Sequence, residues 1–474
     1  MKKRFWLRFI ESCAFLVLLS AVLVFVSGLV ERKKGPHLFG AFFEEPKAYD
    51  VLFLGDSRFM NGMMPLDLWS DYGIAGYNLS CYGNSLPATY WMMMNALDYA
   101  HPKLVVLSVN GVGDERKITG SSGDLHTAFD SFPLTRTKVR AIEDLMHDPE
   151  RPDAVDDEGN RYQNIKWEYY FTLGKYHSRW SELTREDFAR HPAHQRGGEE
   201  LVGVLPYGEY EIIEDDLYAE EMGHGYSYLR KAIEECQSRG IDILLVNMPD
   251  PAMHISQKHA HTAGSIAEEY GIDYIDLMQM DCVIDYEVDC YDEQPHLNVS
   301  GTQKVTDYLG SYLHNRYDLP DRRDDPRYLG WKAARDAYVD QKIERIRAQQ
   351  SMNNVLMLLH DDDFDIRMGI YPDSPLHYDD TSILLMHNLA REHVLAGEEY
   401  EKWSNAMYPL EGFDAALWDN QPYYMHRKSG AVHEYTGEEA LSAMASAFGK
   451  RQSAEVMIEI IDRRNGKTAA QLCF

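Results

Sequence analysis

Hydrophobic positions follow different patterns in different parts of the chain. Residues 12–30 (SCAFLVLLSAVLVFVSGLV) form an uncharged, mostly apolar stretch of 19 positions. Between about residues 49 and 317, short apolar runs alternate with stretches in which apolar residues recur at helical spacing. The short runs are continuous rather than alternating, which is typical of strands covered on both faces. They lie at 51–55, 76–80, 103–110, 242–248 and 273–277.

The alternation of strands and helices predicts a doubly wound α/β domain with a mostly parallel, five-stranded sheet, which we assign to residues 35–330. Two helix starts have clear signals. Ser85 is placed to cap a helix that enters at Leu86 and has a proline in its first turn. Ser300 and Gln303 form a capping box before a helix expected over 301–313.

One interval interrupts the alternation. Residues 114–225 form a charged and aromatic stretch of 112 positions, too long for a plain crossover between strands. We interpret it as an insertion over the carboxyl edge of the sheet, with a helix expected at 178–191. Its aromatic side chains either line a binding groove or form a small hydrophobic core of the insertion. The aromatic residues considered are Trp167, Tyr169, Tyr170 and Trp180.

The remaining part, 331–474, is predicted to be a linker helix followed by a small α/β domain. The helix begins near Trp331, after a polar linker at 318–327. Two hairpins are expected to end the chain, the last one turning at the Asn-Gly pair 465–466. The other expected elements are strands at 354–360 and 364–371 and a helix at 382–392.

The apolar stretch near the N-terminus predicts a membrane anchor over residues 1–34. As a helix, 19 residues reach about 28 Å, close to the hydrocarbon thickness of roughly 30 Å. A cleaved signal peptide is the alternative, but the run exceeds the usual apolar length and no clear A-x-A site follows it. With Lys2, Lys3 and Arg4 before the stretch, we expect the N-terminus in the cytoplasm and residues 35–474 outside it.

Composition narrows the possible functions. Lys and Arg number 47 against 76 Asp and Glu, which gives a formal net charge of −29. This balance argues against a nucleic-acid partner, because phosphate binding needs clustered basic residues. Among the six cysteines, Cys282 and Cys290 are near enough to close a small disulfide loop, although buried free thiols are the alternative. The absence of a C-x-x-C pair leaves a zinc ribbon without support.

Candidate chemistry lies at the expected carboxyl ends of the strands. Ser57 follows the first strand, where open α/β folds place their sites, and a serine nucleophile needs a base. His296 lies in the loop before the last helix of the domain, and Asp292 or Glu293 in that loop is placed to orient it.

Two further residues offer donors for an oxyanion. Gly83 follows the second strand, and its backbone N–H is open to close approach. Asn110 ends the third strand and offers its side-chain amide. With the backbone N–H of Ser57 these make three convergent donors, the arrangement that stabilises a tetrahedral intermediate.

Taken together, these residues resemble the blocks of the SGNH (GDSL-type) hydrolases. The matching positions are Gly55-Asp56-Ser57, Gly83, Asn110, and Asp292 with His296. Two features depart from the family pattern. The usual Asp-x-x-His spacing would select Glu293, whereas Asp292 is one residue further, and we favour Asp292. The asparagine block also lacks the usual Gly-x-Asn-Asp form.

An N-terminal anchor ahead of such a domain is similar to proteins that work beside membrane-bound O-acyltransferases, such as the D-alanyl transfer protein of teichoic acids and the alginate O-acetylation proteins. This resemblance implies Ser57-linked acyl transfer to, or removal from, a cell-envelope polymer, without cofactor or metal. The alternative is a catalytically inactive module that binds the polymer for such a partner. A secreted lipase-type esterase is a third interpretation and requires cleavage of the N-terminal segment.

Overall fold

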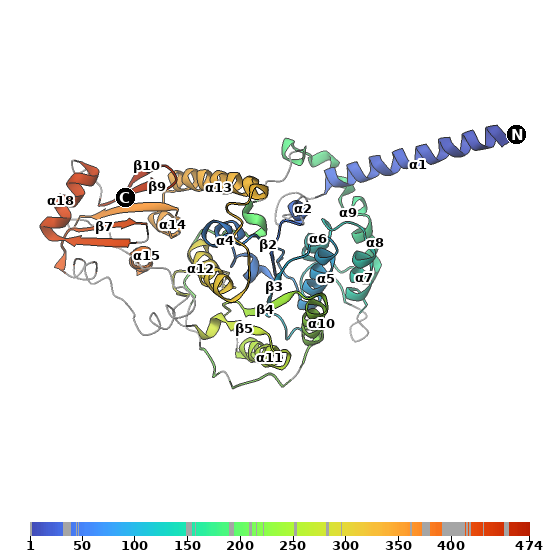
Figure 1. The fold of residues 1–474 in the computed structure, drawn as a ribbon, viewed down its shortest axis with the longest axis horizontal. Coiled ribbons are helices and arrows are strands. Elements are labelled where there is room, and N and C mark those ends of the chain that lie inside the picture. Colours follow the sequence, from blue (N-terminus) through green and yellow to red (C-terminus); the bar gives the residue numbers. More distant parts are fainter. Residues whose placement is uncertain are drawn as a thin grey trace.

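Two sheets and one projecting helix organise the chain (Figure 1). The computed structural model describes residues 2–474 outside the ranges given at the end of this paragraph. One sheet is parallel and holds the candidate site, and the second is antiparallel and lies near the C-terminus. The ranges outside the description are 32–38, 44, 46, 148–153, 157, 189–193, 208–210, 215, 221, 251–253, 281–283, 295, 361–362, 372–379, 391–412, 414–415, 417–418, 430 and 450–454.

The first sheet confirms the predicted parallel sheet of five strands. Its order is β2-β1-β3-β4-β5, and every neighbouring pair is parallel. In register, Leu52 of β1 lies between Tyr77 of β2 and Val105 of β3. The strand bounds are β1 (Val51–Leu54), β2 (Gly76–Asn78), β3 (Leu104–Ser108), β4 (Asp242–Asn247) and β5 (Asp273–Asp276).

Helices cover both faces of this sheet, as its continuous apolar strands require. Successive residues of β1 enter opposite cores: Leu52 packs with residues of α5, α10 and α11, while Phe53 packs with residues of α4 and α12. These helices span α4 (Pro65–Tyr72), α5 (Leu86–Leu97), α10 (His224–Arg239), α11 (His254–Tyr270) and α12 (Val299–Arg316). Shorter elements of this domain are α2 (Phe39–Phe42), α3 (Ser57–Met60) and the 3-10 turns η4 (Leu277–Gln279) and η5 (Pro326–Tyr328).

The two predicted helix starts have different outcomes. Ser85 caps α5 and accepts the backbone N–H of Ala88 at 3.3 Å, as predicted. The capping box before α12 was wrong, because the cap of that helix is Asn298, which accepts the N–H groups of residues 300 and 301. Ser300 instead donates its hydroxyl to the buried carboxylate of Asp289 at 2.9 Å.

The inserted stretch 114–225 contains several short helices. Its first part packs beside α5 and also contacts the loop after β2 at the carboxyl edge, where Thr119 donates its hydroxyl to the Gly83 carbonyl at 3.3 Å. Residues 195–205 also reach the edge, where Glu199 donates its N–H to the Met60 carbonyl and Leu205 to the Cys290 carbonyl. The helix expected at 178–191 was wrong, since two 3-10 turns occupy its described part. The elements are α6 (Ser122–Phe129), α7 (Arg136–Leu145), α8 (Tyr162–Tyr170), α9 (Leu173–Tyr176), η1 (His177–Glu182), η2 (Arg185–Phe188) and η3 (His194–Gly197).

The C-terminal part forms an antiparallel sheet of order β10-β9-β6-β7-β8. Both predicted hairpins are present, β7 with β8 and β9 with β10, and the expected strand and helix near 364 and 382 are confirmed. The strand expected at 354–360 was wrong, because α14 occupies most of it. The bounds are α13 (Leu329–Ala348), α14 (Met352–Leu358), β6 (Phe364–Ile370), α15 (Asp380–Ala390), β7 (Tyr423–Lys428), β8 (Ala431–Thr436), α18 (Gly437–Phe448), β9 (Val456–Asp462) and β10 (Lys467–Cys473).

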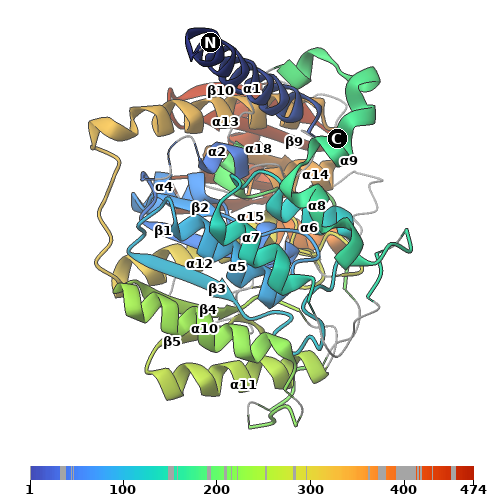
Figure 2. The ribbon, with the colours of Figure 1, turned by 90° about the vertical axis from the view of Figure 1, so that its right-hand side faces the viewer.

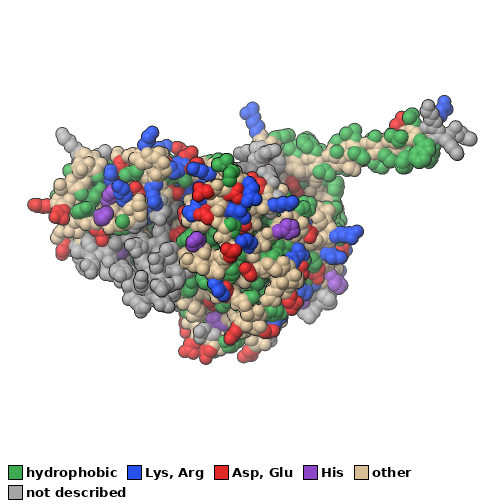
Figure 3. Space-filling model, viewed as in Figure 1, with side chains coloured by type: hydrophobic (Ala, Val, Ile, Leu, Met, Phe, Trp, Pro, Cys, Tyr) green, Lys and Arg blue, Asp and Glu red, His purple; other side chains and the backbone are tan. Residues whose placement is uncertain are grey.

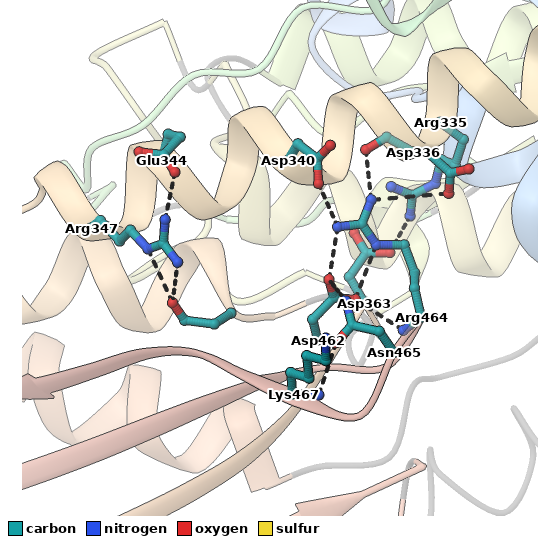
Figure 4. Close-up of polar contacts among 11 residues, drawn as sticks. Arg335, Asp336, Asp340, Glu344, Arg347, Asp363, Asp462, Arg464, Asn465 and Lys467 are labelled. Carbon is teal, nitrogen blue, oxygen red and sulfur yellow. Dashed lines mark hydrogen bonds and ion pairs between the residues drawn. The ribbon is translucent and has the colours of Figure 1, made fainter.

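Helix α13 joins the two parts through charged side chains (Figure 4). Arg335 pairs with Asp67 of α4 at 3.1 Å and with Asp363 before β6 at 2.6 Å. Arg464, in the turn of the last hairpin, pairs with Asp340 of α13 at 2.6 Å. These contacts hold the C-terminal sheet against the first domain.

The projecting helix α1 (Lys2–Val30) carries the apolar N-terminal stretch. Among the described residues, Arg4–Val30 is the one helix long and apolar enough to cross a membrane. Hydrophobic side chains cover α1 where it extends from the rest of the molecule (Figure 3). Cys81, Cys236 and Cys290 are buried free thiols, the alternative to the disulfide loop that the sequence left open, and Cys282 lies outside the described residues.

Candidate active site

Ser57 is held at the end of β1 by close packing of the backbone. Gly55 lies so near β3 that a Cβ atom there would be 2.6 Å from the Cβ of Ser108, so a larger residue would push the strands apart. Asp56 then caps α3 by accepting the N–H of Arg58 at 3.1 Å. Ser57 is the first residue of α3 and is only 8% exposed.

His296 is held by the loop that precedes α12. An isolated bridge pairs Cys290 with Leu297, and Tyr291 donates its N–H to the His296 carbonyl at 2.8 Å. The Asn298 side chain caps α12 and also donates to the Val288 carbonyl at 2.7 Å, so one residue fixes both ends of the loop. His296 is 6% exposed.

The structure brings Ser57, His296 and Asp292 into one chain of hydrogen bonds. His296 Nε2 lies 2.7 Å from Ser57 Oγ, and His296 Nδ1 lies 2.7 Å from Asp292 Oδ2. The other carboxylate oxygen of Asp292 accepts the backbone N–H groups of Gln294 and His296 at 3.0 and 3.2 Å. Glu293 is exposed, and no hydrogen bond among the described residues joins it to His296. Of the two acids left open by the sequence, Asp292 is therefore the one in contact.

This arrangement assigns the protons. An ionised carboxylate only accepts hydrogen bonds, so Nδ1 carries the hydrogen and Nε2 presents its lone pair to the Ser57 hydroxyl. The serine proton can then move to the imidazole, while Asp292 stabilises the imidazolium that results. The geometry is that of a nucleophile, its base and the group that orients the base.

Gly83 and Asn110 lie on the loops that follow β2 and β3, at the same sheet edge. Gly83 has a φ of 61°, a conformation that favours glycine, and its loop is tied beside Ser57 because Cys81 donates its N–H to the Gly55 carbonyl at 3.2 Å. Asn110 Oδ1 accepts from Ser108 Oγ and from the Met248 N–H, at 2.8 and 2.9 Å.

The Asn110 amide therefore has a fixed orientation. Its nitrogen donates one hydrogen to the Met248 carbonyl at 3.2 Å and carries a second one. Among the described residues, no hydrogen bond joins Asn110 or Gly83 to Ser57. The structure thus places both residues at the sheet edge that holds Ser57, without a hydrogen bond to it among the described residues.

A cluster of charges beside Ser57 was not anticipated from the sequence. Arg58 pairs with Asp56 at 2.9 Å and with Asp250, after β4, at 3.0 Å. Burial opposes the charge of the guanidinium, but the two carboxylates outweigh it and raise the pKa of Arg58. Burial, together with the charge of Asp56, raises the pKa of Asp114 to about 6, against the opposing effect of Arg58. The position of Asp250 just after a buried strand is the signal that could have revealed it.

Tyr82 is a second residue that the sequence did not single out. Its ring lies edge-on to the imidazole of His296, with 6.2 Å between centroids, and its hydroxyl donates to Glu199 at 3.1 Å. Burial and the charge of Glu199 raise the pKa of Tyr82, so the hydroxyl stays a neutral donor. Tyr82 thereby joins the inserted stretch to the wall of the site. Its position directly before Gly83 is the feature of the sequence that could have indicated a place beside the site.

Other candidates from the sequence fall outside this site. Tyr169 is buried and stacks on His126 with 3.9 Å between centroids, as the small-core interpretation expects, whereas Trp180 is largely exposed. No group of three or more metal-ligating side chains occurs among the described residues.

No family model matches the chain, and no curated protein matches it either. The resemblance in the four blocks therefore rests on the residues themselves and on the geometry described above.

Proposed function

We propose that this chain is a membrane-anchored, SGNH-like serine acyltransferase or esterase that acts on acyl groups of a cell-envelope polymer. The observation that carries the proposal is the continuous hydrogen-bonded chain from Asp292 through His296 to Ser57. The parallel sheet supports it, since Ser57 lies at the carboxyl edge where open α/β sheets place their sites.

In the proposed reaction, Ser57 Oγ attacks the acyl carbonyl carbon while its proton moves to His296 Nε2. The oxyanion that forms accepts hydrogen bonds from the backbone N–H groups of Ser57 and Gly83 and from the second amide hydrogen of Asn110. Collapse breaks the ester bond, and the leaving alcohol takes the proton from His296. A hydroxyl of the acceptor, or water, then repeats the sequence in reverse and frees Ser57.

The proposed location is supported by α1, whose length and apolar surface suit an uncleaved span. Lys2, Lys3 and Arg4 favour a cytoplasmic N-terminus, and in that orientation the Ser57 site would lie outside the cytoplasm. Polymers of the cell envelope are substrates available there, and a membrane-bound O-acyltransferase is the partner that the resemblance implies.

A second candidate is a catalytically inactive module that binds the polymer for a partner enzyme. One observation favours it: the asparagine block lacks the usual Gly-x-Asn-Asp form, and the Asn110 side chain is held by Ser108 and Met248. In this case Ser57, His296 and Asp292 would keep their hydrogen-bonded arrangement without catalysing a reaction.

Covalent labelling distinguishes the two. The full-length protein in detergent is incubated with an activated ester, and the Ser57 peptide is examined by mass spectrometry. An acyl adduct on Ser57 that disappears in Ser57→Ala and falls strongly in His296→Ala supports catalysis. Ser238→Ala and His101→Ala change exposed residues and serve as matched controls. Equal labelling of all variants, or no labelling of the wild type, would contradict catalysis and support the inactive binding module.

A further inference from the structure

Residues 171–188, here called the collar, pack against the C-terminal end of α1. Ser27 Oγ and Thr172 Oγ1 are 2.8 Å apart. Arg179 donates from one guanidinium nitrogen to the carbonyls of Val30 and Glu31, both at 2.6 Å, and so satisfies acceptors that a helix end leaves open. Asp187 holds the same guanidinium at 3.1 Å. The collar is therefore built onto the end of α1.

The exposure of side chains along α1 shows which part of this helix the rest of the protein covers. Val30 is 2% exposed, whereas Phe25 is 68% exposed and every described side chain from Arg4 to Val22 is also open. Protein thus covers the last turns of the helix and leaves the rest bare. A bare apolar helix needs lipid around it.

The depth of the collar follows from the length of the apolar stretch. The uncharged positions 12–30 reach about 28 Å, so a bilayer core of roughly 30 Å uses all of them. The contacts at Ser27 and Val30 then lie within the last 5 Å or so of that stretch. A segment that touches the helix at this level must itself lie at the boundary between lipid tails and headgroups.

The exposed side chains of the collar suit that depth. Trp180 is 72% exposed and Phe188 is 66% exposed, while the basic and acidic residues of the collar balance one another in number. The two exposed aromatic rings are the feature typical of segments that lie in a membrane interface. Figure 2 shows α7, α8 and α9 on the face from which α1 emerges, which places the collar toward the bilayer.

We infer that the collar is a second membrane contact, which inserts Trp180 and Phe188 into the interface of the bilayer spanned by α1. The inference rests on the proposal that α1 is a membrane span. A helix alone leaves the domain free to tilt, whereas attachment at both α1 and the collar fixes its orientation and the height of the Ser57 site above the lipid. The partner of this surface is the lipid interface and not a second protein.

Photo-crosslinking to lipid tests the inference. A benzophenone amino acid replaces Trp180, Phe188, Phe15 or Leu441, one at a time, in the full-length protein reconstituted in vesicles of phosphatidylcholine and phosphatidylglycerol. Phe15 reports on α1, and Leu441 is an exposed position on α18, at the opposite end of the molecule in Figure 1. All four side chains are exposed, so folding should not change. Lipid adducts are quantified by mass spectrometry after irradiation.

We expect lipid adducts at positions 15, 180 and 188, with those at 441 at least tenfold lower. Adducts at position 15 but not at 180 or 188 would overturn the inferred membrane contact of the collar, whereas α1 would still be a membrane span. If position 15 also fails to label, the span itself is wrong and the collar falls with it. In native membranes, adducts of position 180 with a protein in place of lipid would overturn the inference in favour of a protein partner.

Discussion

His296 Nε2 lies 2.7 Å from Ser57 Oγ, although 239 positions separate the two residues. Each is brought to the same sheet edge by a different element: β1 delivers Ser57, and the loop before α12 delivers His296. The contact is buried enough that the hydrogen bond competes little with water. Everything proposed for the chemistry depends on this one contact.

Asp292→Asn should lower the rate of ester hydrolysis by about 10³–10⁴-fold. An asparagine can present its amide hydrogens to His296 Nδ1 and so favour the tautomer with a hydrogen on Nε2, which cannot accept the Ser57 proton. Initial rates with an activated ester measure the effect.

Glu293→Gln is the matched control, because it removes a neighbouring carboxylate from the same loop without touching His296. Its rate should remain within about twofold of the wild type. A larger loss in Glu293→Gln than in Asp292→Asn would transfer the orienting role to Glu293.

The sequence predicted the parallel sheet because each of its strands is short, apolar and bounded by turn residues. The same criterion failed at 354–360, since a continuous apolar run also fits a buried helix. Ser351 caps α14 there, and leucine and methionine outnumber β-branched residues in the run, which are the signals that favour a helix.

The positions of two residues of the candidate site were predictable, because Ser57 follows a strand and His296 lies in a loop before a helix. The choice between Asp292 and Glu293 could not be predicted from the sequence, because it depends on how the loop before α12 turns back on itself. Likewise, Ser300 and Asn298 both suit a helix cap, and Asn298 is used because Asp289, eleven residues before Ser300, binds the serine hydroxyl. Contacts between distant segments decide such cases.

Asn298→Ala should lower both stability and activity. It removes the cap of α12, worth about 1 kcal/mol, and the bonds that hold the loop of His296. The free energy of unfolding should fall by about 2–3 kcal/mol, because buried backbone carbonyls lose their donor. The rate per folded molecule should fall by at least tenfold, as His296 loses its fixed position.

Thr135→Ala is the control for this prediction. Thr135 caps α7 by accepting the Lys138 N–H at 3.1 Å, so its loss costs a similar cap energy in a helix of the inserted stretch. Thermal unfolding and ester hydrolysis are measured for both variants. If both lose stability but neither loses rate, Asn298 has no role in positioning His296.

The stability contribution of Asp114 should depend on pH. Its pKa in the folded protein is raised from 3.8 to about 6, so the folded state binds more protons than the unfolded state between these values. Stability therefore falls as pH rises from about 4 to 6 and stays lower above 6. The difference corresponds to at most about 3 kcal/mol, and solvent around the partly exposed carboxylate should leave about 1–2 kcal/mol.

Asp114→Asn removes this dependence. The melting temperature of the variant should exceed that of the wild type at pH 8, and the difference should shrink toward pH 4. Melting curves across this range in one buffer series measure it. A difference that grows toward low pH would mean that the Asp114 carboxylate is stabilised in the fold, opposite to the prediction.

Substitution of Arg335 should cause one of the largest losses of stability among the contacts that hold the C-terminal sheet against the first domain. The Arg335 side chain is nearly buried and pairs with Asp67 and Asp363, so Arg335→Ala leaves two buried carboxylates without this cation. Breaking a buried ion pair from one side costs about 3–5 kcal/mol. Glu344→Ala, also on α13, breaks an exposed pair with Arg347 that is worth about 0–1 kcal/mol. Denaturant unfolding should therefore separate the two variants by at least about 2 kcal/mol, and equal losses would mean that the contacts of Arg335 contribute little to holding the C-terminal sheet in place.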